Sequence, residues 1–143
     1  MKIALIAHDE KKELMAQFCL AYCSVLSKYE LCATGTTGRI VADTTGLEIE
    51  RFFSGSQGGS EQVAARIAYK EIDMLLFFRD PLKKNSDDNQ PDDADLLRLC
   101  DMYNIPVATN TATAEVLMQG LGRGDLDWVD VTRDLRKQNR GVL

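Results

Sequence analysis

The chain has 143 residues, of which 45% are hydrophobic and 27% are charged, and its formal net charge is -5 at pH 7. This length suits one domain with a hydrophobic core, so we expect residues 1–143 to form a single domain with a charged extension from about residue 124. The acidic balance argues against nucleic acid or an anionic membrane as the main partner. No apolar run approaches the ~20 residues that a membrane-spanning helix needs.

The N-terminus and the four cysteines bear on the cellular compartment. The first apolar run, residues 3–7, is too short for a signal peptide and His8 and Asp9 follow it at once, which favours the cytoplasm. The cysteines form no Cys-x-x-Cys pair. Cys19 and Cys23 lie four residues apart in a helical pattern, which is typical of small packing residues rather than metal ligands. We predict four reduced thiols and no metal site.

Strand-like and helix-like segments alternate along the chain. The predicted strands cover residues 3–7, 31–34, 47–53, 74–78 and 105–108. The predicted helices cover about 11–29, 39–43, 61–69, 94–103 and 111–120. Five such alternations indicate an α/β fold of three layers, α/β/α, with a five-stranded, mostly parallel, Rossmann-like sheet. The run 74–78 is the most apolar, so we expect it to be the central strand.

The segment from Thr34 to Gly38, Thr-Gly-Thr-Thr-Gly, lies between a predicted strand and a predicted helix. Glycine lets the backbone turn sharply and approach a ligand closely. The threonine hydroxyls, with the unpaired N–H groups and positive dipole end of a helix start, suit an oxyanion such as phosphate. A threonine-capped helix entry that binds nothing remains an alternative for this segment alone.

Polar residues follow every predicted strand at its carboxyl end, where parallel α/β sheets bind ligands. They are His8-Asp9, Thr34 to Thr37, Ser54-Gly55 with Gly58 to Ser60, Asp80, and Thr109-Asn110. The strands themselves are apolar, so this coincidence at one sheet edge predicts a site for a phosphorylated ligand.

Five segments together strongly resemble methylglyoxal synthases, and the resemblance runs from residue 2 to about residue 128. The segments are His8-Asp9, Thr34 to Gly38, Ser54-Gly55 with Gly58-Gly59, Phe77 to Leu82, and Ile105 to Asn110. The resemblance implies a lyase that converts dihydroxyacetone phosphate to methylglyoxal and inorganic phosphate through an ene-diolate. It also implies no metal or organic cofactor, a homohexamer, and inhibition by phosphate.

The resemblance assigns roles to residues by position. It implies that the phosphoryl group is held by Lys12, Thr34, Gly35, Thr36, Thr37, Ser54 and Gly55. It implies that His8 lines the substrate site, although a structural histidine remains an alternative. Asp9, Asp80 and Asp92 match acidic positions of the family's site, whereas Asp80 alone also suits a turn and Asp92 a helix N-cap.

Two positions depart from the family pattern. Ser60 stands where the family has its Asp base, and Asn89 loosely matches the position of a histidine that hydrogen-bonds near the substrate carbonyl. A serine hydroxyl has no useful basicity near neutral pH unless another group activates it. General-base catalysis is typically worth ~10²–10⁴-fold, so losing the base is expected to lower turnover severely.

Three explanations of Ser60 remain open at the level of sequence. Another acid serves as base, for which Glu61, Asp80 and Asp9 are the candidates. Alternatively, the chain no longer catalyses and binds a phosphorylated ligand as a sensor or subunit. Finally, the serine was introduced by substitution to trap a ligand. The phosphate-binding residues favour retained ligand binding in all three.

Overall fold

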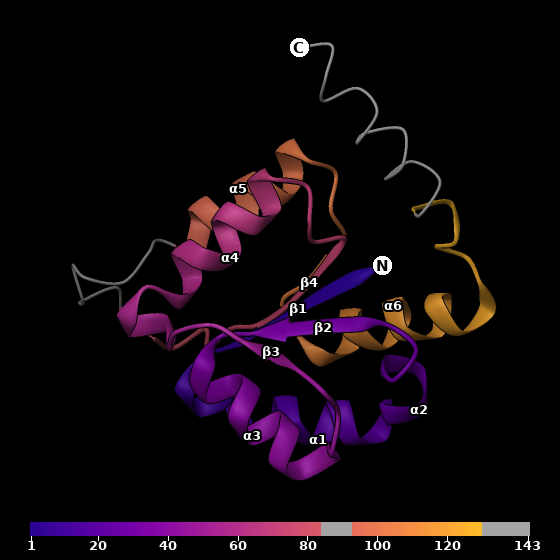
Figure 1. The fold of residues 1–143 in the computed structure, drawn as a ribbon, viewed down its shortest axis with the longest axis horizontal. Coiled ribbons are helices and arrows are strands. Elements are labelled where there is room, and N and C mark those ends of the chain that lie inside the picture. Colours follow the sequence, from indigo (N-terminus) through magenta and orange to yellow (C-terminus); the bar gives the residue numbers. More distant parts are fainter. Residues whose placement is uncertain (84–92, 130–143) are drawn as a thin grey trace.

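The structure, a computed structural model, describes residues 1–83 and 93–129, and its centre is a five-stranded sheet (Figure 1). The strands are β1 Lys2–Ala7, β2 Glu30–Ala33, β3 Glu50–Arg51, β4 Met74–Phe78 and β5 Val107–Ala108. They lie in the order β3-β2-β1-β4-β5, and every neighbouring pair is parallel. The prediction that residues 74–78 form the central strand is wrong, because β1 is the middle strand and β4 lies beside it.

Helices cover both faces of the sheet, which confirms the predicted three-layer α/β/α architecture (Figure 1). One face carries α1 Lys12–Ala21, α2 Cys23–Leu26, α3 Gly35–Thr45 and α6 Thr111–Arg123. The other face carries α4 Gly59–Ala68 and α5 Asp93–Met102. Two short 3₁₀ turns, η1 Asp9–Lys11 and η2 Gly55–Gln57, precede α1 and α4. In the described part of the chain, no helix has both the length and the apolar character to cross a membrane.

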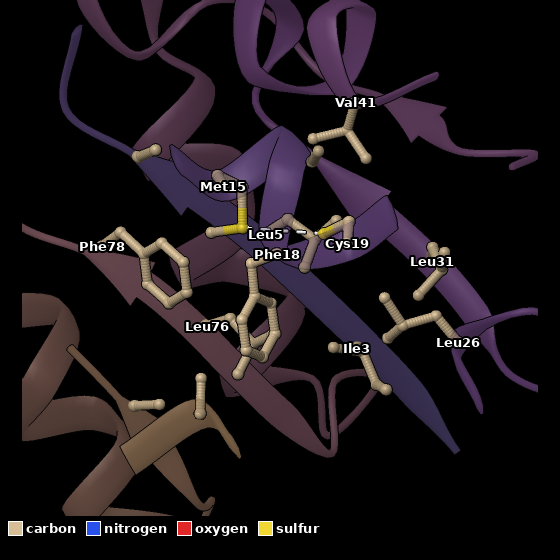
Figure 2. Packing of buried hydrophobic residues seen from close by; sticks show 14 of the residues in the cluster. Ile3, Leu5, Met15, Phe18, Cys19, Leu26, Leu31, Val41, Leu76 and Phe78 are labelled. Atoms are coloured by element: carbon tan, nitrogen blue, oxygen red, sulfur yellow. Dashed lines mark hydrogen bonds between the residues drawn. The ribbon is translucent and has the colours of Figure 1, made fainter. Parts of the chain in front are cut away.

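Alternating side chains of the buried strands enter two hydrophobic clusters. In β1, Ile3 and Leu5 pack on the side of α1 and α3, as Figure 2 shows, whereas Ala4 and Ile6 pack on the side of α4 and α5. A continuous apolar run therefore marks a strand that is covered on both faces. The rigid sheet fixes the positions of the loops at its carboxyl edge.

Cys19, Cys32 and Cys100 belong to this packing, Cys23 is half-buried, and none of the four forms a disulfide. Cys19 lies against Met15 inside the first cluster, with 3.8 Å between the two sulfur atoms (Figure 2). Burial raises the pKa of Cys19 and of Cys32 to about 12, which keeps both side chains as neutral thiols at neutral pH. The prediction of reduced packing cysteines is confirmed.

Two helices begin earlier than predicted. α3 begins at Gly35 rather than near residue 39, and α4 begins at Gly59 rather than at Glu61. Both starts press against the segment after β3: a Cβ on Gly35 would lie 2.8 Å from the Phe52 carbonyl oxygen. A Cβ on Gly59 would collide with the Phe53 carbonyl oxygen. Both glycines let the first turn of a helix come close to the backbone of residues 52–53. From the sequence alone, a glycine at such a position indicates a turn before the helix.

Three other boundaries differ from the prediction. The helix expected over 11–29 is interrupted at Tyr22, where ψ is 23°, and no glycine or proline marks that interruption. After the interruption, the short helix α2 places Leu26 in the hydrophobic core. The edge strands are two residues long, Glu50–Arg51 and Val107–Ala108, although the Pro106 carbonyl oxygen still accepts the Leu75 N–H at 3.0 Å.

Candidate functional site

A cavity of about 170 Å³ opens at the carboxyl edge of the sheet. The cavity lies at the switch point of the strand order, between β1 and β4. From β1 the order runs to β2 and β3 on one side, and from β4 it runs to β5 on the other. Such a switch in direction separates the loops and creates the crevice that binds ligands in doubly wound sheets. Eight of the predicted site residues line it: His8, Asp9, Lys12, Thr34, Thr36, Ser54, Gly55 and Ser60.

The first turn of α3 forms one wall of the cavity. The backbone N–H groups of Thr36 and Thr37 have no acceptor within residues 1–83 and 93–129, as expected for the first turn of a helix. The Gly35 N–H instead donates to the Phe53 carbonyl oxygen at 2.9 Å, so it is not available to a ligand. Thr37 is fully buried and its hydroxyl accepts from the Thr34 hydroxyl at 3.3 Å. Gly35 and Thr37 thus shape the turn, whereas Thr34 and Thr36 face the cavity.

Lys12 brings a positive charge to the same wall. Its Nζ donates to the Ala7 carbonyl oxygen at 2.9 Å and to Asp9 Oδ1 at 2.6 Å. An ammonium has three donors, so one N–H remains for an anion in the cavity. The hydrogen bond from Lys12 lowers the pKa of the Asp9 carboxyl below its usual value, and the charge of Lys12 adds to this. The Asp9 carboxyl therefore stays ionised at neutral pH.

The opposite wall comes from η2 and the start of α4. The Ser54 and Ser56 hydroxyl oxygens are 3.5 Å apart, at the mouth of the 3₁₀ turn. The Ser60 Oγ lies 3.7 Å from the position that a Cβ on Gly55 would take, and the residue is only 9% exposed. Ser60 therefore lies inside the cavity next to Gly55, at the first turn of a helix.

His8 closes the cavity from the end of β1. Its Nδ1 accepts a hydrogen bond of 2.8 Å from the Asp80 backbone N–H, which fixes the neutral imidazole with its proton on Nε2. Burial lowers the pKa of His8, and the nearby Asp93 only partly offsets this, so the ring is neutral at pH 7. Nε2 is buried and lies 3.0 Å from Asp93 Oδ2. The angle of that contact falls short of hydrogen-bond geometry, so the Nε2–H makes no aligned hydrogen bond with a described residue, although Asp93 is close enough to raise the pKa of His8.

The remaining predicted acids lie elsewhere or outside the described residues. The Asp80 carboxylate accepts the Leu82 N–H at 2.9 Å and lines a neighbouring cavity of about 580 Å³ beside the ends of β4 and β5. The Glu61 side chain is exposed, beside Gly58, and does not line the first cavity. Asp92 and Asn89 lie outside the described residues.

Three polar residues of the cavity lining were not predicted from the sequence: Ser56, Lys83 and Asp93. Asp93 is the first residue of α5, and its Oδ2 lies 3.6 Å from Arg79 Nε in addition to the His8 contact. The sequence signal for it was the pair Asp92-Asp93 ahead of a helix, but the resemblance drew attention to the first acid of that pair.

The family of this chain follows from its similarity to known proteins. A family model described as the MGS-like domain matches residues 15–109. A methylglyoxal synthase of Caldicellulosiruptor saccharolyticus is 54% identical over 140 residues, 98% of this chain and 98% of that protein. One from Oceanobacillus iheyensis is 52% identical over 142 residues, 99% of each. The crystal structure of methylglyoxal synthase from Elizabethkingia anophelis NUHP1 is 37% identical, with a TM-score of 0.75 over 82% of this chain and 76% of that one. The resemblance inferred from the sequence is confirmed: the chain belongs to the methylglyoxal synthase family.

Proposed function

We propose that this protein is a lyase that binds dihydroxyacetone phosphate and releases methylglyoxal and inorganic phosphate, without a metal or an organic cofactor. The observation that carries the proposal is the cavity at the sheet's carboxyl edge, where Lys12 meets the unpaired N–H groups of α3. Relatives that share about half of the sequence over nearly its whole length carry the name of that enzyme.

The phosphoryl group suits the end of the cavity formed by α1, α3 and η2. Lys12 has one N–H free of its bonds to Ala7 and Asp9, and it lines the same cavity as Thr36 at the start of α3 and the hydroxyl-bearing Thr34 and Ser54. Charge-assisted hydrogen bonds and the dipole of a helix start both favour an anion there. A dianion there needs no metal to balance its charge, because the ammonium and the helix dipole already favour it. The donors are fixed before the ligand arrives.

The three-carbon part of the substrate then extends toward Ser60 and His8. The reaction starts with removal of a proton from the carbon next to the carbonyl, which needs a base near that carbon. Ser60 occupies the position of the family's Asp base and cannot serve as that base alone. A carboxylate elsewhere in the cavity therefore has to take the proton if the protein turns over.

A second function, binding of a phosphorylated ligand without turnover, is favoured by one observation. Ser60 lies in the cavity next to Gly55, and by the sequence resemblance it stands where the family has its Asp base. The phosphate-binding wall does not depend on Ser60, so a sensor or regulatory subunit would keep it.

The test is release of inorganic phosphate from dihydroxyacetone phosphate by the unaltered protein and by Ser60→Asp, with phosphate binding measured in parallel by calorimetry. Turnover by the unaltered protein supports the lyase. Binding without turnover, together with turnover by Ser60→Asp, supports the binding protein. Failure of both proteins to bind phosphate would contradict the site itself.

We also propose that the protein works as a homohexamer in the cytoplasm. Large apolar side chains exposed on the monomer, including Phe53 at 63% and Trp128 at 48%, are the kind of surface that subunit contacts cover. Sedimentation velocity tests this, with a species of six times the 15.9 kDa chain mass expected. A monomer at micromolar concentration would contradict it.

A further inference from the structure

Two carboxylates line the cavity among the described residues, Asp9 and Asp93, and they differ in availability. Asp9 is bonded to Lys12 at 2.6 Å, its side chain is 96% exposed, and its pKa is lowered by that bond. It is therefore a weak base that is already engaged. The Asp93 side chain is 23% exposed, and its contacts with His8 and Arg79 both involve Oδ2. Within the described part of the chain, Asp93 Oδ1 has no hydrogen-bond partner.

The position of Asp93 beside His8 matches the chemistry of proton removal next to a carbonyl. Such a step needs a base at the C–H bond and a donor at the carbonyl oxygen, and these two substrate atoms are neighbours. Asp93 Oδ2 and His8 Nε2 are 3.0 Å apart, with the Nε2–H unpaired and buried. A buried donor without an acceptor is costly, so it favours a ligand oxygen that accepts from it.

We propose that Asp93 is the general base of this protein and that His8 donates its Nε2–H to the substrate carbonyl oxygen. This inference rests on the proposed function and deepens it, because it names the groups that act at the reacting carbon. Asp93 would supply the base that Ser60 cannot. His8 would supply the hydrogen-bond donor that, in the family, comes from a histidine at the position where this chain has Asn89.

The step balances without any further reactant. The C–H bond next to the carbonyl breaks, its proton goes to the Asp93 carboxylate, and its electron pair forms a C=C bond. The carbonyl oxygen takes the negative charge and accepts the His8 N–H. The ene-diolate then expels phosphate, which leaves with the C–O electron pair and takes up the hydroxyl proton as the hydroxyl carbon becomes an aldehyde. The terminal carbon of the resulting enolate takes the proton held by Asp93, which gives methylglyoxal and restores the carboxylate.

Asp93 is held less tightly by its cationic neighbour than Asp9 is, because Arg79 Nε is 3.6 Å from its carboxylate and Lys12 Nζ is 2.6 Å from that of Asp9. Arg79 Nε lies 3.6 Å from Oδ2, on a side chain that is 42% exposed. An interaction of this kind adds little stability, but it limits the rotation of the carboxylate.

The experiment compares four proteins by phosphate release from dihydroxyacetone phosphate: unaltered, Asp93→Asn, Asp93→Asn with Ser60→Asp, and Asp95→Asn. Asp95 is the matched control, because it is exposed on the same first turn of α5 and does not line the cavity. We expect Asp93→Asn to lower kcat by about 10²- to 10⁴-fold, as loss of a general base does. Ser60→Asp in the same chain should restore turnover, and Asp95→Asn should match the unaltered protein.

Phosphate affinity and the substrate isotope effect separate the outcomes. Asp93→Asn should bind inorganic phosphate as the unaltered protein does, and a primary isotope effect of the unaltered protein with substrate deuterated at the hydroxymethyl carbon marks proton removal. Turnover by Asp93→Asn within about threefold of the unaltered protein would overturn the assignment. So would an unaltered protein that binds phosphate but becomes active only with Ser60→Asp. If the unaltered protein does not bind phosphate, the proposed function itself is overturned.

Discussion

The two ends of the cavity are built from different material. The proposed phosphate end combines the backbone N–H of Thr36 at the start of α3 with the side chains of Lys12, Thr34 and Ser54. The proposed reacting end relies on side chains alone: Ser60 from α4, His8 directly after β1 and Asp93 from α5. A backbone donor survives most substitutions, whereas a single side-chain change removes a base. The comparison teaches that binding and turnover can separate in this fold, and that the reacting end is where relatives can differ in chemistry.

Breaking the backbone frame of the cavity should have the largest effect. Gly59→Ala places a Cβ against the Phe53 carbonyl oxygen, so α4 or the segment before η2 must shift. We expect a loss of more than about 2 kcal/mol of unfolding free energy, together with loss of phosphate binding. Urea denaturation and calorimetry measure the two effects.

Gly122→Ala is the matched control for that change. Gly122 is exposed within α6, and its added Cβ would meet nothing within 4 Å. Alanine is favoured over glycine inside a helix by about 0.5–1 kcal/mol, so this variant should gain stability. Equal behaviour of the two variants would contradict the close approach at Gly59.

The contrast between the two ends also marks the limit of sequence reasoning. The buried strands could be predicted, because the apolar run MLLFF in β4 enters both clusters. The cavity at the sheet edge could be predicted as well, since polar residues follow the strands at their carboxyl ends and eight of the predicted site residues line it. The helix starts at Gly35 and Gly59 could not, because contact with segment 52–54 decides them. Asp93 was missed because its position depends on how α5 packs toward His8.

Lys12→Ala should separate the phosphate end from the reacting end. It removes the cavity's charged donor while leaving Ser60, His8 and Asp93 unchanged. A hydrogen bond to a charged group is worth about 1.5–3 kcal/mol, so phosphate affinity should fall by about 10- to 150-fold. Lys11→Ala serves as control, because Lys11 lines the neighbouring cavity. Unchanged affinity in a titration of Lys12→Ala would contradict the assignment of Lys12 to the phosphate.

Ser60→Asp should reveal how strongly the two ends interact. The added carboxylate lies in the same small cavity as the bound dianion, so it repels phosphate even where it supplies a base. We expect phosphate to bind about tenfold more weakly, or about 1.4 kcal/mol less favourably. Ser60→Asn has similar size without charge and should keep the original affinity. Equal weakening by both variants would mean that volume, not charge, couples the ends.

The smallest expected effect is the change that His8 makes to the pH dependence of the unfolding free energy. This measurement reports on one side chain of the reacting end. His8 is the only histidine of the chain, and burial lowers its pKa below 6.5. Below pH 6.5 the unfolded chain therefore binds a proton at His8 that the folded chain does not. The stability that the neutral ring contributes is complete above that pH and is lost as pH falls toward the folded pKa. His8→Gln removes this titration, and its side-chain oxygen can still accept the Asp80 N–H. Urea denaturation between pH 5.5 and 8 should thus give the unaltered protein the steeper loss on the acid side, and parallel profiles would show that His8 is not the buried neutral donor of the reacting end.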